Sequence, residues 1–259
     1  TNQMMSFRKW QGREDPNLIK PPDGGKKIGD ESVSPTLLVV GDSYATMWGS
    51  GLDRLLRAVK KSGLIIATEG CSVVENVGFK KADECREIVR AQIKFIETSS
   101  VDTIILGGYW AKLFENVNNQ LPPEPMGEQN ILRHSMSRTL EIFKNSGKKI
   151  FIILPIVHAK GDPVSQALNS RARGGRAIYA SLADYEQVYL TQISTQLDQL
   201  KTTYKFEVLA PMKFLCTKNA CLEAVDGKAL YDDRYHLSDF GSEYLADTFL
   251  PVLDHKNRH

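Results

Sequence analysis

The chain has 259 residues, of which 42% are hydrophobic and 25% are charged, and its formal net charge is +2. These values are typical of a globular protein with a sizeable core, folded as one large α/β domain or two small ones. The small net charge gives no electrostatic reason to expect nucleic acid as the main partner. No apolar run approaches the roughly 20 residues that span a bilayer.

Residues 1–35 differ from the rest of the chain. They are rich in proline, glycine and charge, as in "KPPDGGKKIGDE", and show no apolar period. This composition predicts a linker or a strap over the surface. The chain starts without Met and without a signal peptide, so we interpret it as a possible part of a longer protein.

From Thr36 onward, short apolar runs alternate with helical patterns. The runs are β-branched and lack polar alternation, which is typical of strands buried on both faces. Strands are predicted at 36–40, 64–68, 102–106, 149–154 and, as a possible fifth, 205–210. Apolar stripes predict helices over 52–59, 88–96, 132–143 (with Gly147 as a helix C-cap) and 182–200. Alternating strands and helices predict a parallel sheet of about five strands, covered on both faces.

Two long segments, 111–127 and 158–178, follow the third and fourth predicted strands and are expected to be irregular. In an open α/β sheet, ligands bind at the carboxyl ends of the strands. These segments are therefore expected to border a binding site.

The four cysteines, Cys71, Cys85, Cys216 and Cys221, are not spaced as CxxC pairs, and no histidine lies near them at zinc-finger spacing. A metal site is therefore not expected. Four cysteines allow three pairings, and the local one, which closes the shortest loops, joins Cys71 to Cys85 and Cys216 to Cys221. We favour these bridges over four free thiols. They would indicate an oxidising compartment, the periplasm or the extracellular space.

The stretch "LLVVGDSYAT" (37–46) ends a buried strand with Gly-Asp-Ser. Ser43 is then expected at the carboxyl edge of the sheet, either within a turn or as a nucleophile. A nucleophilic serine needs a general base, and histidine is the usual one.

The sequence offers five histidines as a base. His255 and His259 lie in the polar tail, and His134 falls in a helical stripe. His158 follows a strand end and is a secondary candidate. The fifth, His236, comes just before the last predicted helix, which Asp239 or Ser238 can cap. Asp233 precedes His236 by three residues, a spacing that can return a carboxylate to the imidazole in a turn. Asp232 is the alternative, with a less suitable offset.

These motifs resemble the SGNH (GDSL-type) hydrolases, which carry "GDS" after the first strand and Asp-x-x-His before the last helix. The chain is most similar to the branch fused to acyltransferase-3 membrane proteins. The shared features are "EGCS" after the second strand, "LGGYW" after the third and "LCTKNACLEAVDGKALYDDRYHLSDFGS" near the end. The resemblance covers roughly residues 36–250 and implies a three-layer α/β/α, flavodoxin-like fold.

The resemblance implies a Ser-His-Asp triad with Ser43 as nucleophile, His236 as base and acid, and Asp233 as the orienting carboxylate. It implies an oxyanion hole built from the backbone N–H groups of Ser43 and Gly70. No metal or other cofactor is implied.

A third oxyanion donor is an asparagine in the wider family, and "LGGYW" lacks it. The alternatives are Trp110, a backbone N–H of Gly108 or Tyr109, or no substitute at all. Asp42, Tyr44 and Tyr109, which lie beside these positions, are expected to contact the substrate.

The resemblance also implies a role. Residues 1–35 would link an acyltransferase-3 transmembrane domain to a catalytic SGNH domain at 36–259, held in the periplasm and tethered to the inner membrane. The domain would transfer acetyl groups to a carbohydrate hydroxyl of O-antigen or a related surface polysaccharide. Arg171, Arg173 and Arg176 would meet an acidic glycan or the membrane domain, unless they form a solvated loop. The alternatives are a carbohydrate acetylesterase with the same triad and a non-catalytic glycan-binding module.

Overall fold

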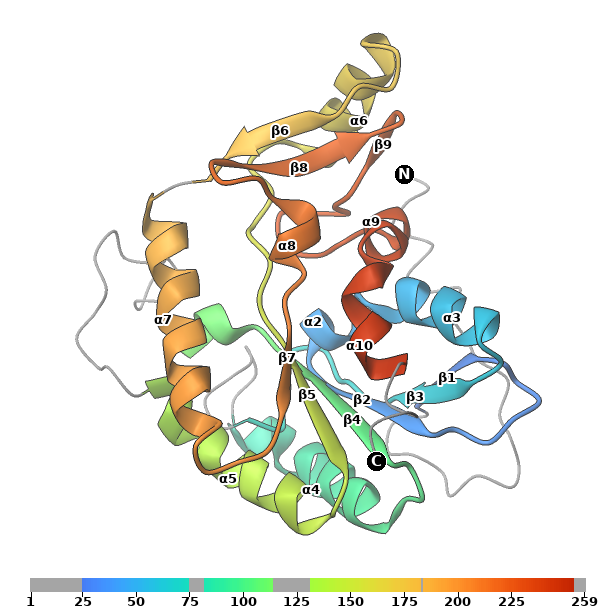
Figure 1. Ribbon diagram of the computed structural model, residues 1–259, viewed down its shortest axis with the longest axis vertical. Helices are drawn as coiled ribbons and strands as arrows, with labels where there is room; N and C mark the ends of the chain where they lie inside the picture. The colour runs from blue at the N-terminus through green and yellow to red at the C-terminus, as the bar shows by residue number, and fades with distance from the viewer. Residues whose placement is uncertain (1–24, 75–81, 114–130, 183, 254–259) are drawn as a thin grey trace.

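The computed structural model describes residues 25–74, 82–113, 131–182 and 184–253 (Figure 1). Its strands are β1 (Lys26–Gly29), β2 (Leu37–Gly41), β3 (Ser62–Ile65), β4 (Thr103–Gly107), β5 (Lys149–Ile153), β6 (Ile178–Ser181), β7 (Glu207–Leu209), β8 (Ala220–Val225) and β9 (Lys228–Ala229). Its helices are α2 (Ser43–Thr46), α3 (Gly49–Ala58), α4 (Ala82–Thr98), η2 (Trp110–Leu113), α5 (Ile131–Asn145), α6 (Pro163–Ala172), α7 (Asp184–Leu200), α8 (Met212–Leu215), α9 (Asp239–Tyr244), η3 (Ala246–Phe249) and α10 (Leu250–Leu253).

The central sheet has the strand order β1-β3-β2-β4-β5-β7. The five strands from β3 to β7 are parallel, and β1 pairs with β3 in the antiparallel direction. Without β1, this is the 2-1-3-4-5 order of flavodoxin-like folds. The predicted α/β class and parallel strands are confirmed. The sequence predicts a linker over 1–35, whereas β1 within that stretch belongs to the sheet.

Helices cover the sheet in two groups. α4, α5 and α7 pack in a row, while α3 packs with α9 and η3 on the opposite side (Figure 1). The strands between them are almost fully buried, as β2 and β4 show along their whole lengths. This burial explains why the strands read as unbroken apolar runs. No helix in these described ranges is both long and apolar enough to cross a membrane.

The second parallel strand begins earlier than predicted. β3 spans Ser62–Ile65, whereas the apolar pattern predicts 64–68. The chain beyond β3 stays bonded to β2, because Ile66 N–H donates to the carbonyl of Val39 and Thr68 N–H to that of Gly41. The predicted run at 64–68 therefore continues along the end of β2 after its pairing with β1 has ended at Ile65.

The sequence predicts an irregular segment at 158–178. In the structure this segment instead contains α6 and leads into β6. β6, β8 and β9 form a separate antiparallel sheet. This sheet projects with α6 from one end of the molecule (Figure 1, top). The Cys216–Cys221 disulfide joins the two ends of the turn that enters β8. The predicted segment at 111–127 lies outside the described residues from 114 onward.

The ends of β2 and β4 meet at two glycines. Gly41 and Gly107 are paired in register, and Gly41 has φ +142°. A Cβ on Gly41 would lie 1.8 Å from the carbonyl oxygen of Gly107 and 3.0 Å from Cβ of Ala45 in α2. Only glycine satisfies both the backbone angle and this close approach. The glycine of the Gly-Asp-Ser motif thus allows α2 to rest on the strand ends.

Gly41→Ala should therefore destabilise the protein by about 3 kcal/mol or more, since backbone strain and steric overlap add. Gly147→Ala is the matched control. Gly147 also has a positive φ, +69°, but no atom lies within 4 Å of its hypothetical Cβ. The control should cost about 1 kcal/mol. Urea unfolding of both variants measures the difference, and equal penalties would contradict the proposed close approach.

Candidate active site

The serine of the Gly-Asp-Ser motif lies at the start of α2, directly after β2. Asp42 is the N-cap of this helix, and its Oδ1 accepts the N–H of Tyr44 at 2.9 Å. Its Oδ2 accepts the N–H of Tyr109, after β4, at 3.0 Å. Because β2 and β4 flank the point where the strand order reverses, Ser43 lies at the topological switch point of the sheet.

Asp42 is only 2% exposed. Burial raises the pKa of Asp42 to about 6, against the opposing effect of the two backbone N–H donors. The sequence predicts that Asp42 contacts substrate. Its burial and its two hydrogen bonds instead indicate that it joins the loop after β2 to the loop after β4.

A chain of hydrogen bonds connects Ser43, His236 and Asp233. His236 Nε2 lies 2.9 Å from Ser43 Oγ, and His236 Nδ1 lies 2.9 Å from Asp233 Oδ2. The other carboxylate oxygen, Asp233 Oδ1, accepts the backbone N–H of Tyr235 at 2.6 Å and that of His236 at 2.8 Å. The carboxylate fixes a proton on Nδ1 and leaves the Nε2 lone pair facing the hydroxyl.

The two neighbouring aspartates differ in environment. Burial raises the pKa of the Asp233 carboxyl, but hydrogen bonds from His236 and two backbone N–H groups outweigh it and lower the pKa overall. The pKa of Asp232 is raised to about 6 by burial and by the negative charges of Asp239 and Asp233. Asp233 is therefore the stable carboxylate partner of the imidazole.

The loop that carries this histidine is closed on itself and anchored to the sheet. Tyr231 and Leu237 form an antiparallel bridge, and Asp232 N–H donates to the carbonyl of His236 at 2.9 Å. The hydroxyl of Tyr231 donates to the carbonyl of Val157, beyond β5, at 2.9 Å. The loop is thus held against the same sheet edge as α2.

The helix after the loop supplies a second anchor. Ser238, one of the two predicted caps, is the N-cap of α9: it accepts the N–H of Gly241 at 3.0 Å and donates to the carbonyl of Ala229 at 2.8 Å. α9 packs closely on α3, where the N–H of Gly51 donates to Ser242 Oγ at 2.9 Å. Because α3 follows α2 directly, the same contact supports both sides of the site.

Possible oxyanion donors are fewer than predicted. The N–H of Ser43 is at the first position of α2, where a helix has no internal acceptor. The indole N–H of Trp110 donates to the carbonyl of Ile153 at 2.8 Å, and its backbone N–H donates to Gly108. Both N–H groups of Trp110 are thus bonded within the chain, and the N–H of Tyr109 is bonded to Asp42. The N–H of Gly108 remains a candidate.

Gly70 lies in a turn that runs beside the end of β2. It has φ +73°, and the turn is tied to Gly41 through the N–H of Thr68, at 3.2 Å. The following residue, Cys71, forms a disulfide with Cys85 at the start of α4. Both predicted disulfides are present, and the first of them fixes the turn that carries Gly70. Its role as an oxyanion donor stays a prediction.

An aromatic cluster surrounds the histidine. The ring of Tyr44 stacks on Tyr109, with centroids 4.7 Å apart, and lies 5.2 Å from the ring of His236. Both tyrosines are 4% exposed, so they form the base of the site rather than its open surface. The sequence singles out His158 as a secondary base, but its ring packs on Tyr109 and Tyr235 while His236 contacts the serine. Sequence analysis missed Tyr235, although it precedes His236.

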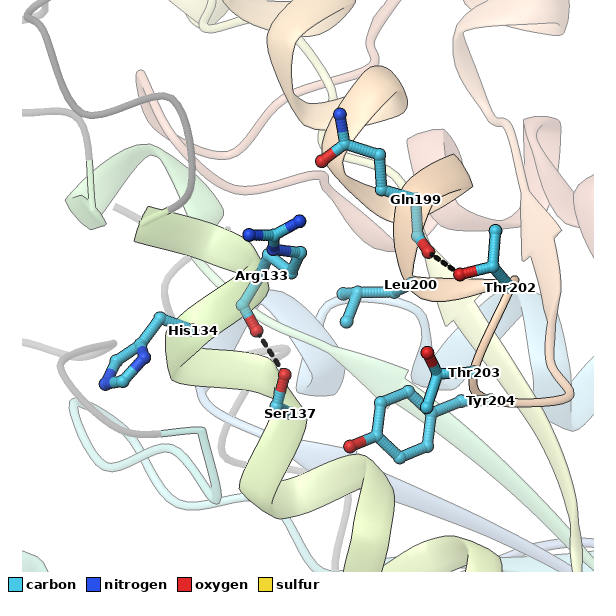
Figure 2. Close-up of a pocket in the computed structure, with 8 residues that line it drawn as sticks. All are labelled: Arg133, His134, Ser137, Gln199, Leu200, Thr202, Thr203 and Tyr204. Carbon is cyan, nitrogen blue, oxygen red and sulfur yellow. Dashed lines mark hydrogen bonds between the residues drawn. The ribbon is translucent and has the colours of Figure 1, made fainter.

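A separate cavity of about 340 Å³ lies between α5 and the end of α7 (Figure 2). It is lined by Arg133, His134, Ser137, Gln199, Leu200, Thr202, Thr203 and Tyr204. The hydroxyls of Ser137 and Thr202 donate to the carbonyls of Arg133 and Gln199, both at 2.7 Å, and the ring of His134 points away from the hollow (Figure 2). This cavity contains no residue of the candidate active site. His255 and His259 lie outside the described residues.

Comparison with protein families agrees with the fold and the motifs. Residues 11–251 match the family model described as SGNH domain (fused to AT3 domains). The match spans most of the chain, so the chain belongs to this family.

A solved structure with a TM-score above 0.5 shows the same fold. The periplasmic domain of the lipopolysaccharide acetyltransferase from Salmonella ser. Paratyphi A is similar with a TM-score of 0.62 and 17% identity, over 85% of this chain and 84% of that one. A putative acylhydrolase from Bacteroides fragilis matches with a TM-score of 0.48 and 11% identity, over 89% of this chain and 91% of that one. No curated protein sequence matches the chain.

Asp233→Asn should lower the turnover of p-nitrophenyl acetate by about 10³–10⁴-fold, because an amide nitrogen facing Nδ1 favours the wrong tautomer of His236. Asp232→Asn is the matched control and should change turnover less than about tenfold. Steady-state kinetics with both variants tests the assignment. A larger loss in the Asp232 variant would transfer the orienting role to that residue.

Asp42→Ala should destabilise the protein by about 2–4 kcal/mol, because two buried N–H groups lose their acceptor. Since burial raises the pKa of Asp42 to about 6, the stabilisation by this carboxyl is fully present below its ordinary pKa of 3.8 and declines as the pH rises through 6. The penalty should therefore be larger at pH 5 than at pH 8. Urea unfolding at both pH values measures it, and a larger penalty at pH 8 would contradict this account.

Proposed function

We propose that this chain is the SGNH domain of a glycan O-acetyltransferase, which transfers acetyl groups to a carbohydrate hydroxyl through an acetyl-serine intermediate. The observation that carries the proposal is the continuous chain of hydrogen bonds from Ser43 through His236 to Asp233. A binding module has no need for a serine, a base and an orienting carboxylate in this order.

The proposed reaction has two steps. In the first, Ser43 Oγ attacks the carbonyl carbon of an acetyl donor while His236 Nε2 takes the hydroxyl proton and then delivers it to the leaving group. Asp233 stabilises the imidazolium. In the second step, a sugar hydroxyl attacks acetyl-Ser43 with His236 as base, a new ester bond forms, and the proton returns to Ser43 Oγ. The N–H groups of Ser43 and Gly70 stabilise the oxyanion in both steps.

Family membership supports the proposed setting. SGNH domains of this type are described as fused to AT3 domains, and the similar Salmonella protein is a periplasmic domain of a lipopolysaccharide acetyltransferase. In the proposal, the residues before β1 connect the domain to an acyltransferase-3 transmembrane domain, which supplies the acetyl group. The domain then works in the periplasm on O-antigen or a related surface polysaccharide. The two disulfides are consistent with an oxidising compartment.

A carbohydrate acetylesterase is the second candidate. The same hydrogen-bonded serine, histidine and aspartate would also catalyse hydrolysis, in which water instead of a sugar hydroxyl attacks the acetyl-serine. The side-chain exposures of 24% for His236 and 55% for Asp233 favour this candidate, because water can reach the base in the isolated domain.

Incubation with p-nitrophenyl acetate should add about 42 Da to the intact protein, with the acetyl group on Ser43. Intact-mass and peptide mass spectrometry measure the adduct and its decay with and without de-O-acetylated O-antigen oligosaccharide. Faster decay with the sugar, with acetylated sugar as product, indicates a transferase; decay indifferent to the sugar indicates an esterase.

Ser43→Ala and His236→Ala are the matching controls and should form no adduct while keeping a native circular dichroism spectrum. Full turnover in either variant would refute the assignment of the triad. A stable wild-type protein that forms no adduct would favour the glycan-binding module.

A further inference from the structure

A second histidine lies beside the candidate triad. His158 is in the chain that leaves the carboxyl end of β5, and its ring packs edge-on to Tyr235 with centroids 4.8 Å apart. It also packs at 5.8 Å on Tyr109, the ring that stacks on Tyr44. Tyr44 in turn lies against His236. His158 thus borders the same aromatic cluster as the proposed base without contacting the serine.

The imidazole of His158 is half-buried, and within the described residues neither ring nitrogen hydrogen-bonds to a protein group. Burial lowers the pKa of His158 to about 4, with help from the positive charges of Arg234, Lys160 and His236 and against the negative charge of Asp233. At neutral pH the ring is uncharged and offers one N–H donor and one lone pair.

An exposed aromatic ring stands next to it. The side chain of Tyr235 is 39% exposed, the largest exposure in the aromatic cluster. The guanidinium of Arg234 lies 5.8 Å from the centre of the same ring. The orientation of Tyr235 is coupled to the triad, because its backbone N–H donates to Asp233 Oδ1. An aromatic face of this kind can pack against the C–H face of a sugar ring.

We propose that His158 and Tyr235 form the acceptor subsite of this domain, in which Tyr235 packs on a pyranose ring and His158 hydrogen-bonds one of its hydroxyls. This inference rests on the proposed acetyl-transfer function. The two contacts hold a neighbouring hydroxyl of the sugar over acetyl-Ser43. The acceptor subsite therefore decides how much of the acetyl-enzyme passes to sugar and how much is lost to water.

The chemistry of transfer is unchanged by this assignment. The sugar oxygen forms a bond to the acetyl carbon, the bond from that carbon to Ser43 Oγ breaks, and His236 moves the proton from the sugar to the serine. His158 and Tyr235 contact the acceptor and take no proton.

The test is the ratio of acetyl transfer to hydrolysis, measured on the 259-residue chain with p-nitrophenyl acetate as donor and de-O-acetylated O-antigen oligosaccharide as acceptor. His158→Phe keeps a ring but removes both nitrogens, and should lower the ratio about tenfold through a higher KM for the sugar. His158→Gln, which restores a donor and an acceptor, should recover part of the loss. The matched control is His134→Phe on α5, which should leave the ratio at the wild-type value.

Tyr235 is tested in the same assay. Tyr235→Ala should lower the ratio about tenfold or more, whereas Tyr235→Phe, which keeps the ring, should stay close to wild type. Equal ratios in the wild type, His158→Phe and Tyr235→Ala would overturn the inference. The inference would also be overturned if both rates, acetyl transfer and hydrolysis, fell in the same proportion in these variants, because that result indicates a structural role.

A binding measurement separates this inference from the proposed function. Saturation-transfer NMR on the Ser43→Ala variant detects contact with the oligosaccharide without any reaction. If the wild type fails to transfer acetyl groups, sugar binding to Ser43→Ala that is lost in the Tyr235→Ala double variant still supports the acceptor subsite. Absence of sugar binding to Ser43→Ala, or binding unchanged in the double variant, would refute it.

Discussion

The buried carboxylate of Asp42 is the interaction on which the geometry of the site depends. It accepts one backbone N–H from α2 and one from the loop after β4, and so joins two segments 67 positions apart. The close approach of Gly41 and Gly107 brings these segments within reach. The Gly-Asp-Ser triplet therefore combines the backbone angle of Gly41, the connection between loops made by Asp42 and the proposed nucleophile Ser43. Each residue type in it has a separate physical reason.

The position of the imidazole depends on more distant parts of the chain. His236 meets Ser43 across 193 positions of sequence, and no local contact could hold that distance. The loop of His236 is bonded to the carbonyl of Val157 through Tyr231, while α9 behind it is clamped onto α3. The first anchor ends just beyond β5, a strand of the sheet that also contains β2, and the second ends on α3, which follows α2. The serine and the histidine therefore share one rigid frame, which a preorganised site requires.

Local patterns predicted much of the fold and of the candidate site. Buried parallel strands appear in the sequence as unbroken apolar runs. The spacing of Asp-x-x-His is local, because the carboxylate of Asp233 closes a turn onto the following backbone N–H groups, so Asp233 and His236 could be proposed from the sequence. β1 was missed because its four residues, "KKIG", carry a single fully apolar side chain between glycines and lysines. The role of Trp110 depends on a tertiary contact with Ile153, which no local pattern encodes.

Two histidines near the same aromatic cluster have opposite electrostatic surroundings. His236 has a carboxylate at 2.9 Å, so the positive charge that it gains as a base is stabilised. His158 has two basic side chains and His236 around it, and these oppose a charge there. In the proposed reaction, a proton taken from Ser43 would therefore stay on His236 and not move to His158. This asymmetry keeps His158 available as a neutral hydrogen-bonding group while the proposed chemistry proceeds beside it.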